Sequence, residues 1–149
     1  MSTTDNDPVL DIRDLSVSFN TARGSLCALR HVDITVPQNK IVGIVGESGC
    51  GKSTLINSVL RLLSPNSEVN AESEVIFQGD DVMKMDNASL QGLRGQRISM
   101  IFQDPMTALN PVISIGQQMV DVLYRQDLNK AQKRERAAEM LSQVGIPDP

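Results

Sequence analysis

The chain has 149 residues, enough for one domain with a hydrophobic core, and 40% of them are hydrophobic while 21% are charged. Its formal net charge is −4, without the basic stripe that binding to a nucleic-acid backbone needs, so nucleic acid is not an expected partner. The apolar runs are too short to span a membrane, and the first residues lack the basic and apolar parts of a signal peptide, so a cytoplasmic protein is expected.

The beginning of the chain favours antiparallel β structure. Residues 1–7 are polar and are expected to form a disordered tail. Residues 15–19 and 32–36 alternate apolar and polar side chains with period two, which predicts two half-exposed strands. Because residues 21–25 have the composition of a turn, the two strands are expected to pair with one face open to water.

The next segment predicts a strand, a glycine-rich loop and a helix. Residues 41–45 form an uninterrupted apolar run, typical of a strand buried on both faces of a parallel sheet. Glycines follow at once, and from Ser53 to Leu63 apolar residues recur at helical spacing. Pro65 lies just beyond the last of them and is expected to end the helix.

Further elements are predicted along the rest of the chain. Residues 74–77 read as a strand ending in a Gln78-Gly79 turn, and residues 80–97 as loop plus a short helix. Residues 98–102 are a second apolar run that predicts a core strand, and a helix with one apolar face is expected after Pro111.

The last predicted helix has clear start and stop signals. Asn129 can cap its first turn, with Gln132 three residues on in the position of a capping box. Gly145 and Pro147 follow the apolar stripe and mark its end.

Cysteine and histidine usage indicates no structural cross-link. Cys27 and Cys50 are the only cysteines and have no C-x-x-C spacing, and His31 is the only histidine. Neither a disulfide framework nor a zinc site is therefore expected, and both cysteines are expected to be free thiols.

The glycine loop carries the strongest functional signal. Residues 46–53 match G-x-x-x-x-G-K-[ST], in which the backbone wraps a phosphate chain at the N-terminus of a helix. Lys52 is expected to reach the β and γ phosphates and Ser53 to offer its hydroxyl to Mg²⁺. The alternative is a glycine-rich turn that only caps a helix. The residues predicted to bind nucleotide here are Gly46, Glu47, Ser48, Gly49, Cys50, Gly51, Lys52, Ser53 and Thr54.

Cys50 leaves two interpretations open. A small side chain that points away from the phosphates is preferred, and a thiol that gates the site is the alternative, because a positive loop beside a helix N-terminus favours thiolate.

The residues after the phosphate loop distinguish between families with such a loop. A GTPase would need a carboxylate for guanine, which residues 129–132 lack. Residues 101–111, by contrast, resemble the Q-loop of ABC ATPases, in the form of the peptide, nickel and opine uptake subfamily. The resemblance extends to residues 15–19, 43–55, 93–95 and 144–146, and so to nearly the whole chain.

This resemblance implies an α/β P-loop NTPase fold of the ABC ATPase type, with an antiparallel β part and the start of a helical subdomain. Residues 8–149 would be the N-terminal part of the ATP-binding domain, which makes the chain look truncated. The cofactors implied are ATP and Mg²⁺. Lys52 and Gln103 would be the catalytic residues, and Ser53 and Gln103 the magnesium-binding ones.

For two side chains, a structural role is the alternative to the functional one. Gln103 would contact Mg²⁺ and the attacking water and link the nucleotide to a membrane subunit, but it also suits a turn before Asp104. Phe19 matches the position of the aromatic residue that stacks on adenine, yet its alternation with Leu15 and Val17 equally allows a core-facing role.

Several parts of an ABC ATPase are missing after Gln103. The sequence has no Leu-Ser-Gly-Gly-Gln signature, no apolar strand ending in Asp-Glu and no downstream switch histidine, because His31 precedes the phosphate loop and Asp121 continues a helical pattern. The chain alone is therefore expected not to hydrolyse ATP, and its central strands to lack neighbours and expose apolar edges.

The function implied is that of an ATP-binding subunit energising import of peptides or similar small solutes. The implied partners are membrane permease subunits, a second ATP-binding subunit in a homo- or heterodimer and, indirectly, an extracytoplasmic solute-binding protein, with the chain peripheral on the cytoplasmic face of the inner membrane. One alternative is a nucleotide-binding module without hydrolysis of its own. Another is a non-transport ABC ATPase of DNA repair, disfavoured by residues 104–111 and by the acidic charge balance.

Overall fold

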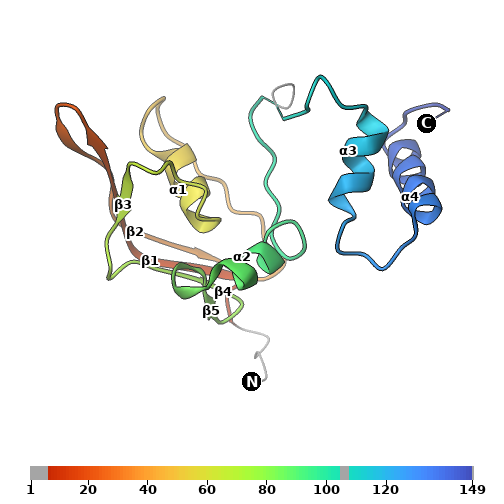
Figure 1. Ribbon diagram of the computed structural model, residues 1–149. Coiled ribbons are helices and arrows are strands. Elements are labelled where there is room, and N and C mark those ends of the chain that lie inside the picture. Colours follow the sequence, from red (N-terminus) through yellow and green to blue (C-terminus); the bar gives the residue numbers. More distant parts are fainter. Residues whose placement is uncertain (1–6, 105–107, 149) are drawn as a thin grey trace. The chain divides into compact units, whose positions relative to one another are not determined.

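The computed structural model describes residues 7–104 and 108–148, which form two compact units, Met1–Ser99 and Met100–Pro149 (Figure 1). Each unit is treated by itself below. The predicted tail at residues 1–7 lies almost wholly outside the described residues.

The first unit is built on a long antiparallel hairpin. Strand β1, Leu10–Thr21, pairs with β2, Gly24–Val36, from Leu10 opposite Val36 to Thr21 opposite Gly24. The two strands predicted from alternation are thus confirmed; β1 extends beyond residues 15–19 at both ends, and β2 begins before residue 32 but ends at Val36 as predicted. The turn is confirmed as well, because only Ala22 and Arg23 separate the strands.

Three short strands complete the sheet. Strands β3, Ser67–Val69, and β4, Glu74–Phe77, both pair antiparallel with β1, and β5, Asp80–Asp81, pairs with β4. The order is β2-β1-β4-β5, with β3 beside β1. The strand predicted at residues 74–77 is confirmed.

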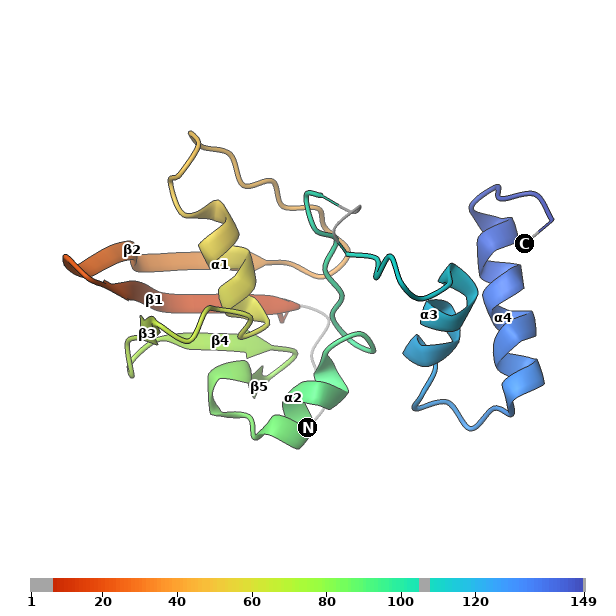
Figure 2. The same cartoon turned by 45° about the horizontal axis from the view of Figure 1, so that its top comes forward.

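Helices cover one face of this sheet, as Figure 2 shows for α1. Helix α1 spans Lys52–Val59, the 3₁₀ helix η1 spans Val82–Lys84 and α2 spans Asn87–Leu93, which confirms the loop and short helix predicted after residue 80. The core is a single cluster of buried apolar side chains from the strands and from all three helices: Ile12, Leu15, Val17, Leu29, Leu55, Val75, Phe77, Val82, Leu90 and Leu93.

Helix α1 is shorter than its apolar spacing predicts. Leu60 caps it, Arg61 takes a left-handed backbone conformation with φ 50°, and the Leu62 N–H donates to the Asn57 carbonyl at 2.8 Å. This is the pattern that closes the end of a helix, so the prediction that the helix continues to Leu63 was wrong. Leu63 instead packs against the core from the following loop.

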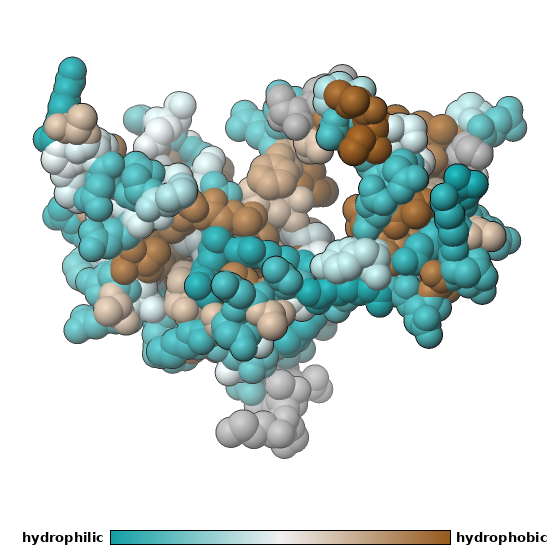
Figure 3. Space-filling model, viewed as in Figure 1, coloured by the Kyte–Doolittle hydropathy of each residue, from teal (hydrophilic) through white to brown (hydrophobic). Residues whose placement is uncertain are grey.

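The predictions of core strands at residues 41–45 and 98–102 were wrong. Neither segment is a strand, and the exposed fractions of Ile41, Val45 and Ile101 are 101%, 95% and 95%. A strand needs neighbouring backbones to hydrogen-bond with, and no described strand pairs with either segment. The expected exposure of apolar side chains is observed, and the space-filling view shows hydrophobic surface open to solvent (Figure 3).

The second unit is a pair of helices packed on each other. Helix α3 spans Ile115–Val122 and is capped by the Ser114 side chain, which accepts from the Gln117 N–H. Helix α4 spans Lys130–Gln143, and Asn129 and Gln132 form the predicted capping box with reciprocal hydrogen bonds of 3.0 and 2.9 Å. Both predicted helices are confirmed.

None of the helices among the described residues is both long enough and apolar enough to cross a lipid bilayer.

Candidate nucleotide-binding site

The phosphate loop of the first unit leads directly into helix α1. Gly51 is the N-cap residue, with φ 96°, and no side chain caps the helix among the described residues. The first helical hydrogen bond runs from the Leu55 N–H to the Gly51 carbonyl at 2.9 Å. The backbone N–H groups of the first turn therefore remain available to an anion, which also gains from the positive end of the helix dipole.

Gly51 has a second role that the sequence motif does not reveal. A Cβ atom at this position would lie 2.9 Å from both the Ala28 carbonyl oxygen and the Leu29 Cδ2 atom. The loop thus rests directly on strand β2, and only a residue without a side chain fits there in a left-handed conformation. Gly49 also has positive φ, 82°, but has open space where a Cβ would be.

Lys52 lies across the loop. Its ammonium donates to the carbonyl oxygens of Gly46 at 2.7 Å and Glu47 at 2.6 Å. These two bonds tie the end of the loop to its beginning and hold a positive charge beside the open N–H groups. This arrangement suits the oxygens of a nucleotide's phosphate chain.

The Cys50 thiol lies in the same loop, beside the Lys52 ammonium. Its sulfur accepts from the Lys52 ammonium at 3.5 Å and lies 2.7 Å from where a Cβ on Gly46 would be. The side chain is therefore close to the Lys52 ammonium, a position compatible with both the passive and the gating interpretation. Both stay predictions.

Ser53 and Thr54 occupy the first turn of α1. Ser53 is exposed, so its hydroxyl is accessible to a cation, and a hydroxyl is a ligand that Mg²⁺ accepts beside phosphate oxygens and water. The residues present thus fit a Mg-nucleotide: open N–H groups, a lysine and a serine hydroxyl around one loop. Glu47, Ser48 and Gly49 are exposed along the same loop.

Gln103 belongs to the second unit and is exposed. It does not follow a strand, because residues 98–102 form none. Residues 105–107 of the same segment lie outside the described residues. The role of Gln103 at Mg²⁺ stays a prediction, since the two units are described separately.

Phe19 lies on β1, opposite Leu26 of β2 and Ser67 of β3. Its side chain is partly buried and packs against the core of the first unit, whereas Leu26 opposite it is 60% exposed. Part of the Phe19 side chain therefore has a structural role. The part that reaches solvent is accessible to a nucleotide base, so stacking stays a prediction.

Replacing Phe19 by alanine is expected to weaken the binding of ATP about tenfold, because stacking on the base contributes about 1–3 kcal/mol. The affinity for inorganic triphosphate, which has no base, is expected to stay nearly unchanged. Competition binding with the two ligands measures both affinities. Equal losses for ATP and triphosphate would assign Phe19 to core packing alone. Leu10 is the matched control, since it also lies on β1, is partly buried and packs against the same core.

Comparison with known proteins identifies the family. Residues 29–149 match the family described as ABC transporter. The chain belongs to the ABC transporter family, which confirms the resemblance drawn from the phosphate loop and the segment around Gln103.

Named relatives agree with this assignment. The chain is 42% identical over 144 residues to the dipeptide transport ATP-binding protein DppD of Bacillus subtilis, covering 96% of this chain and 43% of that protein. It is 37% identical over 142 residues to the oligopeptide transport ATP-binding protein OppD of the same organism, covering 95% of this chain and 40% of that one. The chain thus spans about two fifths of the length of these curated relatives.

Solved structures share the fold. A dimeric post-hydrolysis state of the ATP-binding cassette MJ0796, bound to ADP and Pi, superposes with a TM-score of 0.72 at 23% identity. The match covers 91% of this chain and 56% of that one. The predicted ABC ATPase fold is thereby confirmed.

Proposed function

We propose that this chain is an ATP-binding part of an ABC importer of peptides or similar small solutes. The observation that carries the proposal is the phosphate loop, with the Lys52 ammonium 2.7 Å from Gly46 O beside an uncapped helix N-terminus. Likeness to proteins named for dipeptide and oligopeptide transport supports the solute class. Peptide, nickel and related solutes would share the motifs of the loop, so the solute class rests on the relatives.

In this proposal each residue of the loop has a separate task. The N–H groups at the start of α1 and the Lys52 ammonium bind the phosphate chain and balance its charge. The Ser53 hydroxyl holds Mg²⁺, which when bound neutralises charge on the β and γ phosphates. Gln103 orients the attacking water and senses the γ-phosphate. Phe19 stacks on the adenine.

Hydrolysis needs more groups than this chain contains. The sequence has no Leu-Ser-Gly-Gly-Gln segment and no apolar run ending in Asp-Glu. Phosphoryl transfer depends on positioning water and stabilising charge on all sides of the γ-phosphate. We therefore assign the chain alone a binding role, and turnover to an assembly with a second ATP-binding subunit and permease subunits at the cytoplasmic face of the membrane. A solute-binding protein on the far side would take part indirectly.

The test is ATP hydrolysis by the chain in liposomes with the permease subunits and a full-length ATP-binding subunit of a peptide importer. The chain alone is expected to bind Mg-ATP without turnover, and the assembly is expected to show solute-stimulated hydrolysis. Gln103→Ala is expected to slow that hydrolysis about a hundredfold, because it removes a group that positions the attacking water.

Gln143→Ala is the matched control, because Gln143 is an exposed glutamine of the same unit at the end of α4. Equal rates for wild type and Gln103→Ala would remove Gln103 from the mechanism. Binding of Mg-ATP without turnover in the complete assembly would favour the nucleotide-binding module instead.

A further inference from the structure

A cavity of mixed polar and apolar lining lies in the first unit, apart from the phosphate loop. Its volume is about 410 Å³, and it is lined by residues of α1 and the segment that follows it, strand β3, the β3–β4 connection and η1. Its lining includes two cations, Arg61 and Lys84, together with hydroxyls and the Asn70 amide, and no Asp or Glu of the described residues lines it. This volume is at the lower end of the range for small-molecule sites.

Arg61 adopts a backbone conformation that normally favours glycine. It follows the cap of α1 with φ 50°, its N–H donates to the Ser58 carbonyl at 3.0 Å, and Leu62 completes the turn. A side chain in the left-handed region costs about 1–2 kcal/mol relative to glycine. Strain of this kind tends to persist where the side chain has a function.

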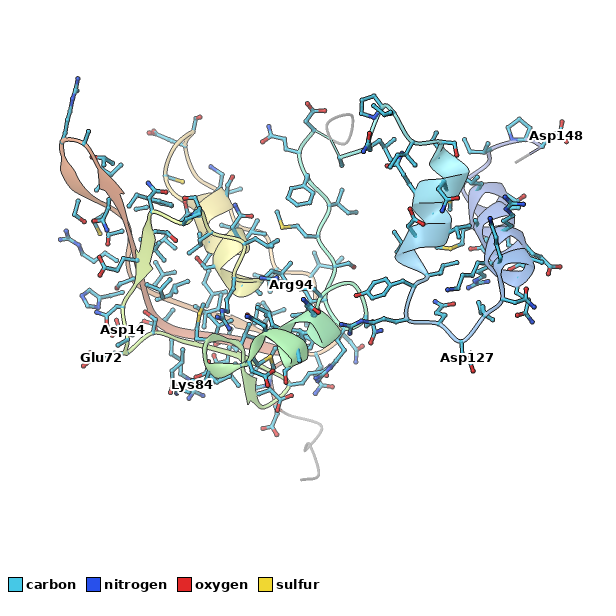
Figure 4. All side chains as sticks on the ribbon, viewed as in Figure 1. Asp14, Glu72, Lys84, Arg94, Asp127 and Asp148 are labelled. Atoms are coloured by element: carbon cyan, nitrogen blue, oxygen red, sulfur yellow. The ribbon has the colours of Figure 1, made fainter. Side chains whose placement is uncertain are left out.

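The Arg61 side chain is fixed on one side and open on the other. Its Nη1 atom donates to the Met85 carbonyl at 2.7 Å and to the Val82 carbonyl at 3.5 Å. Arg94, labelled in Figure 4, secures the backbone of the same turn by donating to the Arg61 carbonyl at 2.8 Å. Within the described part of the chain, Nε and Nη2 of Arg61 have no hydrogen-bond partner.

Nε and Nη2 form the side edge of a guanidinium, whose two parallel N–H groups match a carboxylate or a phosphate. Arg61 lines the cavity and is anchored through Nη1, so this edge is available as a donor pair for an oxyanion. Without such a ligand, the Nε and Nη2 N–H groups would donate to water.

The second cation of the cavity is held in its charged form. Lys84 pairs with Asp81 at 2.7 Å and with Glu74 at 3.6 Å, and the hydrogen bond to Asp81 raises the pKa of the Lys84 ammonium. Figure 4 labels Lys84 on η1. Because two carboxylates surround this ammonium, it adds little net positive charge, and Arg61 is the main anion-binding group of the cavity.

Two serines in the wall of the cavity have fixed positions. Ser58 and Ser73 are buried, with exposed fractions of 0% and 4%. Their hydroxyls donate to the Thr54 carbonyl at 2.7 Å and the Asp14 carbonyl at 3.0 Å, so their positions are fixed. The wall also includes apolar side chains, so the polar groups that a ligand can contact are mainly those of Arg61, Asn70 and Lys84.

We propose that this Arg61 pocket binds a small oxyanion, a carboxylate or a phosphate, independently of the phosphate loop. The site goes beyond the proposed function, because it shares no residue with the nucleotide site. The arginine supplies the bidentate contact, and the Lys84 ammonium, which has one N–H beyond its two carboxylate contacts, lines the same wall.

The test uses inorganic phosphate and succinate as separate probes of the Lys52→Ala protein, in which the phosphate loop no longer competes. Line broadening in ³¹P NMR reports phosphate, and saturation transfer in ¹H NMR reports succinate. At least one probe is expected to bind, and Arg61→Gly is expected to weaken it at least about tenfold, the loss of roughly one charge-assisted hydrogen bond. Glycine suits the left-handed backbone, so this variant is expected to fold.

Asn39→Gly is the matched control, since Asn39 is exposed, has φ 56° and lies outside the cavity. Ala71→Phe places a bulky ring in the lining while Arg61 is kept, and it is expected to weaken binding of the same probe, which tests the site even if Arg61→Gly does not fold. Binding of phosphate alone would identify the ligand class as a phosphate, and binding of succinate alone would identify it as a carboxylate. Absence of binding by both probes at millimolar concentration, or binding that survives both pocket variants, would overturn the proposal.

Discussion

Replacing Lys52 by alanine is expected to remove about half or more of the stabilisation of the chain by Mg-ATP. In the wild type, nucleotide at about 100 times its dissociation constant should add about 2.7 kcal/mol to the free energy of unfolding. The variant loses the ammonium that lies 2.7 Å from Gly46 O and 2.6 Å from Glu47 O, and with it the positive charge nearest to the uncapped helix start. Because hydrogen bonds to charged groups contribute about 1.5–3 kcal/mol each, affinity should fall at least tenfold.

Thermal unfolding followed by circular dichroism is the measurement for this variant, because the chain has no tryptophan and one tyrosine. Lys40→Ala is the matched control, an exposed lysine six residues before the loop begins. It should keep the full nucleotide shift. An unchanged shift in Lys52→Ala would mean that the loop only caps a helix, the alternative left open by the sequence.

Replacing Gly51 by alanine is expected to lower both stability and nucleotide affinity. The new Cβ would lie 2.9 Å from the Ala28 carbonyl oxygen and from Leu29 Cδ2, and the backbone there has φ 96°. The left-handed conformation costs about 1–2 kcal/mol for alanine, and crowding against the β2 backbone adds about 1–3 kcal/mol. Relief of the crowding would move the loop away from β2 and misplace the first turn of α1.

Two other glycines separate the causes. Gly49 has positive φ but open space around a built Cβ, so Gly49→Ala should lose only the part of the stability that comes from the left-handed backbone. Gly43→Ala has neither constraint and should be nearly neutral. Urea unfolding of the three variants, each with and without Mg-ATP, gives the comparison. If Gly51→Ala and Gly49→Ala lose equal stability, then contact with β2 is not what requires glycine at position 51.

Local signals predicted much of the structure because the interactions that they encode are local. Period-two alternation at residues 15–19 and 32–36 identified the β1–β2 hairpin, in which each strand is the other's nearest partner. Asn129 and Gln132 identified the start of α4, because both hydrogen bonds of a capping box lie within one turn.

Predictions failed where a segment needs partners distant in the sequence. Residues 41–45 are as apolar as a buried strand, yet burial and strand geometry both depend on neighbours that no described element supplies. Residues 98–102 failed for the same reason. The end of α1 was misplaced because apolar spacing continued to Leu63, while the closing turn at Arg61 needs no glycine when other contacts hold it.

The sequence by itself determined the phosphate loop with its lysine and serine, since these depend on residue types at fixed spacing within eight residues. It also determined the family, through the further segment at residues 101–111. Only the tertiary structure decided that Gly51 rests on β2, that Phe19 packs partly into the core, and that Arg61 and Lys84 line one cavity. Those relations join residues more than twenty positions apart, and contacts at such separation follow from how the sheet and helices pack rather than from any local pattern.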